Sequence, residues 1–152
     1  MFGLKFPRRL ILYIIIGLQL GLIYSIIYRN IYGMDILPRQ FYQFALIAAL
    51  IGTMEELTFR GFIQGHAGKI NAVFGVLFAT FSHTAYKCCL FLIPINNFEI
   101  NIAYLFLFTF TGGLLFGLLK EISKSVIPAV VAHVVFDILV YGECLQSPWW
   151  VW

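Results

Sequence analysis

Six ionisable side chains that could do chemistry lie within strongly apolar stretches of the sequence. They are Glu55, Glu56, Arg60, His83, His133 and Asp137. A charge at the centre of a bilayer costs about 2.5–3.5 kcal/mol on insertion scales, and such residues usually face a protein interior and serve a function. Carboxylates and imidazoles can activate water, bind a metal ion or relay protons. The structural alternative is that these groups form ion pairs and hydrogen bonds that hold helices in register.

Helical spacing divides these residues into pairs. Residues four apart lie on one face of an α-helix, so Glu56 can pair with Arg60. By the same rule His133 and Asp137 lie one turn apart on one face. Glu55 points about 100° away from Glu56 around the helix. We therefore expect Glu55 to be the carboxylate without a partner on its own helix.

The depth of these residues in a membrane is also similar. At a rise of 1.5 Å per residue, Glu55, His83 and His133 fall within roughly 9 Å of one another along the membrane normal. The sequence therefore predicts a single intramembrane site that three helices share.

The composition indicates that lipid surrounds this site. Of 152 residues, 61% are hydrophobic and 11% are charged, whereas soluble domains have about 45–50% and about 25%. The mean hydropathy is +0.91. So few polar side chains cannot cover a water-facing surface. The net charge is only +3, without a long Lys/Arg run, so the sequence offers little electrostatic basis for binding nucleic acid.

Five apolar segments could position the six residues. They cover residues 10–28, 41–62, 71–86, 100–119 and 125–141, and each is near the 17–25 residues that cross a bilayer. Residues 88–98 are apolar but contain Pro94, so we expect an interfacial or re-entrant loop there. The predicted fold class is all-α: a polytopic transmembrane helix bundle of about five spans, forming one integral-membrane domain over residues 1–152.

The basic residues predict how the bundle is oriented. With the N-terminus in the cytoplasm, six Lys and Arg lie on the inner side and three, Arg29, Arg39 and Lys87, on the outer side. This bias favours an N-in, C-out topology, with the Trp-rich tail 148–152 at the outer interface. No small-residue cleavage site follows the first span, so we expect a retained helix and not a signal peptide. The expected location is the cell membrane (inner or plasma), with multiple passes.

Glycines at four-residue spacing predict where helices pack closely. The pairs are Gly17/Gly21, Gly61/Gly65 and Gly113/Gly117. Small residues at this spacing let the backbones of transmembrane helices approach each other.

The charged motifs resemble those of a known family. The run Glu55-Glu56-Leu57-Thr58-Phe59-Arg60-Gly61 resembles the Glu-Glu-x-x-x-Arg signature of the CPBP family of intramembrane endopeptidases, also called the ABI or CAAX-protease family. His83 falls where the second motif, Phe-x-x-x-His, has its histidine, with Ala79 at the Phe position. The run from His133 to Asp137 fits the third motif, His-x-x-x-Asn/Asp. The resemblance covers a core of about residues 41–141.

The resemblance implies a glutamate-dependent peptide hydrolase. In such an enzyme Glu55 would be the general base that activates a water molecule, assisted by His83. His133 and Asp137 would bind the oxyanion, and the other two residues of the first motif would brace the site. The substrate would be a membrane-anchored protein or peptide, cut near its C-terminus, and no cofactor is implied. The short chain favours compact members similar to sorting-tag proteases of the myxosortase type.

Three other functions fit the same residues. Two His and a carboxylate can hold Zn²⁺ with one position open for water, which would make a zinc-dependent intramembrane protease, although His-Glu-x-x-His is absent. A proton-coupled transporter could use buried Glu and His as a relay, although the sequence has no internal repeat. A non-catalytic membrane immunity or binding protein could keep the motif as a structural brace.

Overall fold

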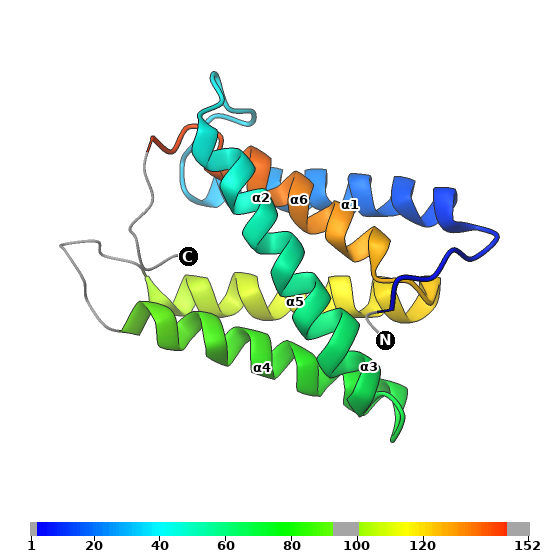
Figure 1. Ribbon diagram of the computed structural model, residues 1–152. Coiled ribbons are helices and arrows are strands. Elements are labelled where there is room, and N and C mark those ends of the chain that lie inside the picture. Colours follow the sequence, from blue (N-terminus) through cyan, green and yellow to red (C-terminus); the bar gives the residue numbers. More distant parts are fainter. Residues whose placement is uncertain (1–2, 93–100, 146–152) are drawn as a thin grey trace.

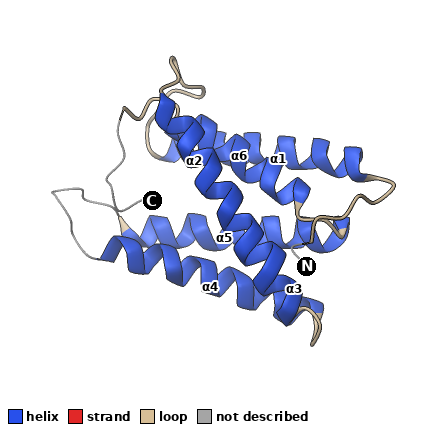
Figure 2. Ribbon diagram, in the orientation of Figure 1, coloured by secondary structure: helices blue, strands red, loops and turns tan. Residues whose placement is uncertain are grey.

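The fold is helical throughout the part of the chain that the structure describes. The structure is a computed structural model, and it describes residues 3–92 and 101–145. Its elements are α1 (Leu10–Ile31), α2 (Gln43–Glu56), the π-helix η1 (Leu57–Ile63), α3 (Gln64–Ala67), α4 (Ala72–Leu92), α5 (Ile102–Ser123) and α6 (Ile127–Tyr141). Figure 2 shows helices and connecting loops in these ranges. The predicted all-α class is confirmed.

Side chains are distributed as expected for a protein in lipid. Three described helices, Leu10–Ile31, Ala72–Phe91 and Ile102–Ser123, are long and apolar enough to cross a membrane, and Ile127–Val140 is a shorter apolar helix. Large apolar side chains on the outside include Ile11, Leu46, Leu50, Phe81, Leu107 and Leu118. Buried charged side chains include Arg29, Glu55, Glu56, Arg60 and Asp137. The predicted helical membrane bundle is therefore confirmed.

Two pairs of helices form the bundle, and one long helical segment joins them. α1 packs on α6, and α4 packs on α5. Residues 43–67 continue through α2, η1 and α3 without a break, and this segment crosses both pairs in Figure 1. α2 packs on α6, whereas η1 and α3 pack on α4. Side chains near the middle of the crossing segment can therefore meet residues from both pairs.

Glycines bring α1 and α6 into close contact. A Cβ atom at Gly17 would overlap the carbonyl oxygen of Pro128, and one at Gly21 would overlap that of Ala132. The packing predicted for these two glycines is confirmed. At Gly65 a Cβ atom would meet nothing within 4 Å, so no close packing requires that glycine.

The predicted position for the end of the third span is wrong. We expected it to end at residue 86 and a loop to begin at 88, but α4 continues to Leu92. The residues of 87–92 are all compatible with a helix, and Pro94 restricts mainly the residue directly before it. The rest of the expected loop, residues 93–98, and the Trp-rich tail 148–152 lie outside the described residues. The other four predicted spans are helical, with bounds shifted by a few residues.

Arg29 joins the end of α1 to the end of α6. Its guanidinium group is fully buried, although the sequence suggested only an outer-side basic residue. It donates hydrogen bonds to the carbonyl oxygen of Asp35 at 2.5 Å, to that of Leu139 at 2.8 Å and to Glu143 Oε2 at 2.9 Å. Burial is compatible with the charge because each contact supplies an acceptor.

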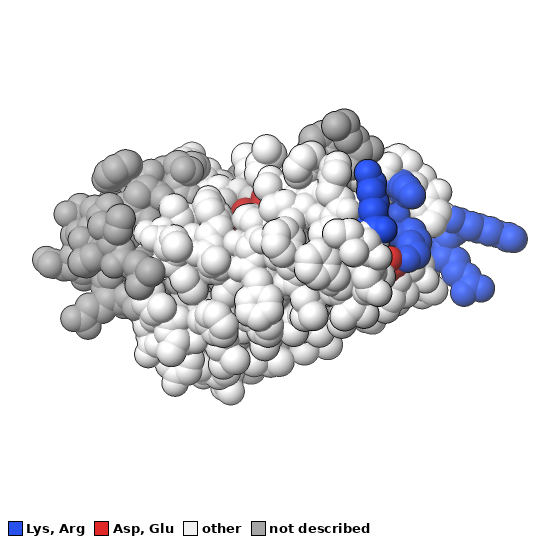
Figure 3. Space-filling model, turned by 90° about the horizontal axis from the view of Figure 1, so that it is seen from below, with Lys and Arg blue, Asp and Glu red and all other residues white. Residues whose placement is uncertain are grey.

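Basic side chains gather at one end of the face seen in Figure 3. Arg8, Arg9 and Lys124 line a hollow of about 640 Å³, where α1 begins and α5 has ended. The predicted N-in orientation depends on this one-ended distribution of positive charge.

Candidate active site

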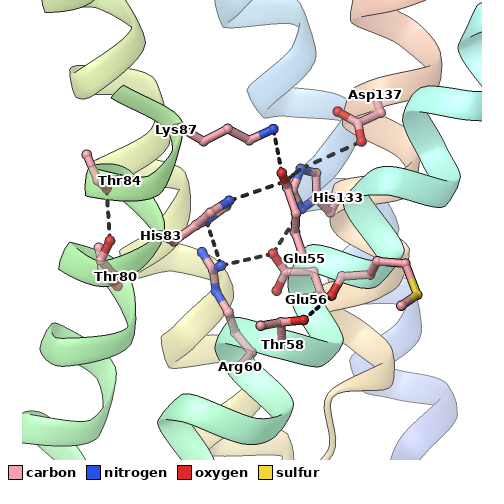
Figure 4. Close-up of polar contacts among 11 residues, drawn as sticks. Glu55, Glu56, Thr58, Arg60, Thr80, His83, Thr84, Lys87, His133 and Asp137 are labelled. Carbon is pink, nitrogen blue, oxygen red and sulfur yellow. Dashed lines mark hydrogen bonds and ion pairs between the residues drawn. The ribbon is translucent and has the colours of Figure 1, made fainter. Parts of the chain in front are cut away.

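The structure brings together all six residues that the sequence singled out. Figure 4 shows their side chains pointing toward one another from three parts of the bundle. Glu55 and Glu56 end α2, Arg60 lies in η1, His83 lies in α4, and His133 and Asp137 lie in α6. All six side chains are buried. The structure therefore confirms the predicted geometry, in which side chains from three helical segments lie close together at one location.

Glu55 has no partner on its own helix, as expected, but other helices supply several. Its Oε2 lies 3.2 Å from Nε2 of His83 and 3.8 Å from Nε2 of His133. Its Oε1 lies 2.5 Å from Nζ of Lys87. Glu55 is 6% exposed, so these contacts take the place of water around its carboxylate.

The predicted pair of Glu56 and Arg60 is confirmed, and each member also holds an imidazole ring. Arg60 Nη1 lies 3.3 Å from Glu56 Oε1 and 2.7 Å from His83 Nδ1. Glu56 Oε1 lies 2.9 Å from His133 Nδ1. Both histidines are therefore held through Nδ1, while their Nε2 atoms face Glu55.

These contacts define which ring nitrogen carries the proton in each histidine. A guanidinium group can only donate hydrogen bonds, so Nδ1 of His83 accepts from Arg60, and the proton of the neutral ring is on Nε2, directed at Glu55. An ionised carboxylate can only accept, so Nδ1 of His133 donates to Glu56. A neutral His133 then presents an unprotonated Nε2 to the site. In their neutral forms the two rings therefore carry the proton on different nitrogens, Nε2 in His83 and Nδ1 in His133.

Asp137 lies beside His133 without a hydrogen bond between them. Its Oδ2 is 3.6 Å from His133 Nε2, which is beyond hydrogen-bond distance. The side chain is 5% exposed. The predicted placement of these two residues on one face of α6 is confirmed, and both face α2.

Gly52 is a site residue that the sequence motifs did not indicate. A Cβ atom there would overlap Oδ2 of Asp137 and would lie 3.0 Å from Cδ2 of His133. Gly52 precedes Glu56 by one helical turn, so α6 packs its two polar side chains directly against the backbone of α2. A small residue one turn before the double-glutamate motif was the available signal.

The π-helix is a second feature that the sequence did not reveal. η1 begins directly after Glu56 and contains Arg60. Its wider turn changes the direction of the side chains that follow it, and π segments within α-helices often occur at functional sites. From this segment Arg60 reaches both its helix neighbour Glu56 and His83 of α4.

Lys87 is the third missed residue. We expected Lys87 just outside the third span, but it lies within α4, one turn after His83. Its ammonium group contacts Glu55, and Figure 4 shows it reaching that carboxylate from the helix that carries His83. Because the predicted helix ended at residue 86, its direction could not be inferred.

Hydrogen bonds within the protein orient both imidazole rings at Nδ1. Among the residues that the structure describes, no three His, Cys, Asp or Glu side chains are placed together as metal ligands. Nδ1 of His83 faces the positively charged Arg60 at 2.7 Å, and Nδ1 of His133 is bonded to Glu56. The ring nitrogens are thus oriented by hydrogen bonds within the protein.

Comparison with protein families identifies the class of protein. A family model described as type II CAAX prenyl endopeptidase Rce1-like matches residues 37–139, a range that contains all six site residues. The chain belongs to this family. Membership and the apolar helices make it an integral-membrane protein, and they imply CAAX-type protease activity on a membrane-associated protein. Comparisons with curated proteins and with solved structures give no match.

Proposed function

We propose that this protein is an intramembrane endopeptidase that hydrolyses a peptide bond with a water molecule activated by Glu55. One observation carries the proposal: Oε2 of Glu55 faces Nε2 of both His83 and His133, at 3.2 and 3.8 Å. A buried carboxylate beside one imidazole donor and one imidazole that can accept or donate is suited to moving protons during acyl transfer.

Glu55 acts as the general base in this proposal. It accepts a proton from water as the water oxygen attacks the carbonyl carbon of the peptide, and it then passes that proton to the departing amine nitrogen. His83 assists through its Nε2–H, which points to Oε2 of Glu55. Arg60 holds that imidazole in place from the other side.

His133 and Asp137 bind the oxyanion of the tetrahedral intermediate. Because His133 donates its Nδ1 proton to Glu56, it needs a second proton to donate from Nε2. It can carry that proton as an imidazolium beside an ionised Asp137, whose Oδ2 lies 3.6 Å away. Alternatively, Asp137 is itself protonated and donates to the oxyanion. Both forms supply a preorganised donor where negative charge develops.

We also propose a substrate for this protease and the membrane in which it works. The substrate is a membrane-anchored protein cut near its C-terminus, and the protease works in the cell membrane as one integral-membrane domain over residues 1–152. Its motif-bearing core is about residues 41–141. The proposed chemistry uses no cofactor. We also propose a similarity to sorting-tag proteases of the myxosortase type.

Mass spectrometry of membrane-protein C-termini tests this function. Cells with the parent protein should contain shortened C-termini that are absent from cells without it and from cells with Glu55→Gln. The same set of C-termini in all three would contradict the proposal. A chelator added to the protein in detergent should leave cleavage unchanged. Loss of cleavage that added Zn²⁺ restores would favour the zinc protease instead.

A further inference from the structure

Lys87 contacts the proposed general base but belongs to none of the three motifs. It follows His83 by one turn of α4, so both side chains leave the same face of that helix. His83 reaches Oε2 of Glu55, and Lys87 reaches Oε1 at 2.5 Å. The two oxygens of one carboxylate are therefore held from a single helix.

We infer that Lys87 is a positioning residue of the protease site, whose ammonium group holds Oε1 of Glu55 so that Oε2 stays directed at His83 and His133. The inference rests on the proposed function, because it gives Lys87 a role in orienting the base. The terminal torsion of a glutamate has a broad distribution, so contacts to one oxygen leave the plane of the carboxylate free to rotate. A contact to the second oxygen restricts that rotation.

Among the charged groups around the site, Lys87 is the one placed to hold Oε1 of Glu55. The titratable and charged groups that face Glu55 come from α2, η1, α4 and α6: Glu56, Arg60, His83, Lys87, His133 and Asp137. Two of these groups, Arg60 and Lys87, are basic side chains other than histidine. Arg60 contacts Glu56 and His83. Lys87 is therefore the cation available to the Glu55 carboxylate in the described part of the chain.

Lys87 also lies nearer the surface than the other groups in contact with Glu55. Its side chain is 20% exposed, against 4% for His83 and 10% for His133. A small amine can therefore enter the space left by a shortened side chain at position 87. Because of this accessibility, an added amine can test whether a positive charge is needed at the position of the Lys87 ammonium group.

The test compares Lys87→Ala and Lys87→Arg with the parent protein in detergent. The substrate is an internally quenched peptide with the cleavage sequence found by mass spectrometry. Lys87→Ala should lower kcat by about 10²-fold, because the base is misplaced, and should change KM by less than about threefold. Lys87→Arg should keep most of the activity. Ethylammonium chloride should raise kcat of Lys87→Ala about tenfold and leave the parent and Lys87→Arg unchanged.

Lys120→Ala is the matched control. Lys120 is 13% exposed in α5 and lies 3.5 Å from Glu121, outside the site, so its loss should leave kcat unchanged. Full activity of Lys87→Ala would overturn the inference. So would a loss that appears mainly in KM, or one that ethylammonium does not restore in a folded variant.

A stability measurement separates this inference from the proposed function. Peptide hydrolysis absent from the parent protein would contradict the function. The Lys87–Glu55 contact can still be tested through Tm, with Lys87→Ala, Glu55→Gln and the double variant. Two groups in contact should give a non-additive change in Tm. Additive changes would overturn the positioning role whatever the activity.

Discussion

At the scale of single residues, Glu56 and Arg60 matter through the ring nitrogens that they contact. Arg60 binds Nδ1 of His83 at 2.7 Å, and Glu56 binds Nδ1 of His133 at 2.9 Å. A donor and an acceptor at these places give the two rings different proton positions. The pair is therefore more than an intramembrane ion pair, because it orients both imidazoles toward Glu55.

Glu55→Gln should fold and insert but lose peptide hydrolysis by about 10²–10⁴-fold, since an amide cannot accept the proton of water. The measurement is cleavage of a quenched peptide in detergent, with Tm as the check on folding. Glu56→Gln is the matched control, one residue away on the same helix, and should lower Tm more. An active Glu55→Gln beside an inactive, folded Glu56→Gln would reverse the two roles.

The oxyanion proposal makes a prediction for α6. If His133 is an imidazolium beside an ionised Asp137, His133→Ala should cost about 2.7–4 kcal/mol of transition-state stabilisation, read from kcat/KM, because a donor to the oxyanion is lost. Asp137→Asn separates the two protonation schemes, since asparagine supplies an N–H donor of the same shape. Retained activity indicates a protonated Asp137, and lowered activity indicates that an ionised Asp137 supports an imidazolium at His133. Full activity of His133→Ala would contradict an oxyanion role for this ring.

At the scale of helices, the distance between α2 and α6 decides whether the site forms. Gly52 permits this distance, because a Cβ atom there would overlap Asp137. The long segment 43–67 packs on α6 through α2 and on α4 through η1 and α3. Its π-helix lies where it passes from one partner to the other.

Gly52→Ala should lower both activity and stability. The added methyl group displaces Asp137 and His133, and overpacking of this kind typically costs about 1–3 kcal/mol. The measurements are kcat/KM and Tm in detergent. Gly65→Ala is the control on the same helical segment, where a Cβ atom meets nothing within 4 Å. It should leave activity unchanged and should not lower Tm, since alanine favours the helix over glycine. Unchanged activity in Gly52→Ala would show that α6 can move without affecting the site.

The contact between the ends of α1 and α6 predicts a pH-dependent stability. The pKa of Glu143 lies below its ordinary value of 4.5, because its carboxylate accepts hydrogen bonds from the Arg29 side chain and the backbone N–H of Arg39. A group with a lowered folded-state pKa stabilises the fold above its unfolded pKa and loses this effect as pH falls through the folded value. Tm of the parent should therefore exceed that of Glu143→Gln near neutral pH.

The same comparison should show a smaller difference in acid. Between about pH 6 and about pH 3, the Tm values of the parent and Glu143→Gln should converge, as protonation of Glu143 removes the ion pair. A difference that does not depend on pH would show that the Arg29 contact with Glu143 contributes no charge-dependent stability.

At the scale of the whole molecule, the surface is more apolar than the functional centre. In the described part of the chain, exposed Leu, Ile and Phe lie on the outside, while the carboxylates and imidazoles of the site lie in the interior. This distribution fits a protease that works within lipid, because lipid tails solvate the outer surface and the interior can hold polar groups that hydrocarbon would exclude.

The distribution of basic residues predicts the orientation of the molecule. Lys124, with a side chain 67% exposed, should lie on the cytoplasmic side, and Arg39, 80% exposed, on the opposite side. Single-cysteine variants Lys124→Cys and Arg39→Cys test this in a chain whose three native cysteines are replaced by serine. In intact cells a membrane-impermeant thiol reagent should label only position 39. Labelling of position 124 alone would indicate the opposite orientation.

The sequence by itself determined the helical class, the set of six buried ionisable residues and their local pairing. A backbone in hydrocarbon must satisfy its own hydrogen bonds, so long apolar segments form helices. Glu56 and Arg60 pair because helical neighbours four residues apart meet whatever the rest of the fold does. The cost of burying charge predicted that the six residues would share an interior.

The tertiary structure alone decided which atoms of these residues meet. Lys87 could not be assigned to Glu55 from its position in the chain, because the 31 residues between them include a turn and most of α4. The contacts of Gly52 with α6 and of Arg29 with the end of α6 likewise join distant segments. Such contacts depend on how helices cross and rotate against one another. Those angles come from the packing of whole faces, which no local spacing of residues encodes.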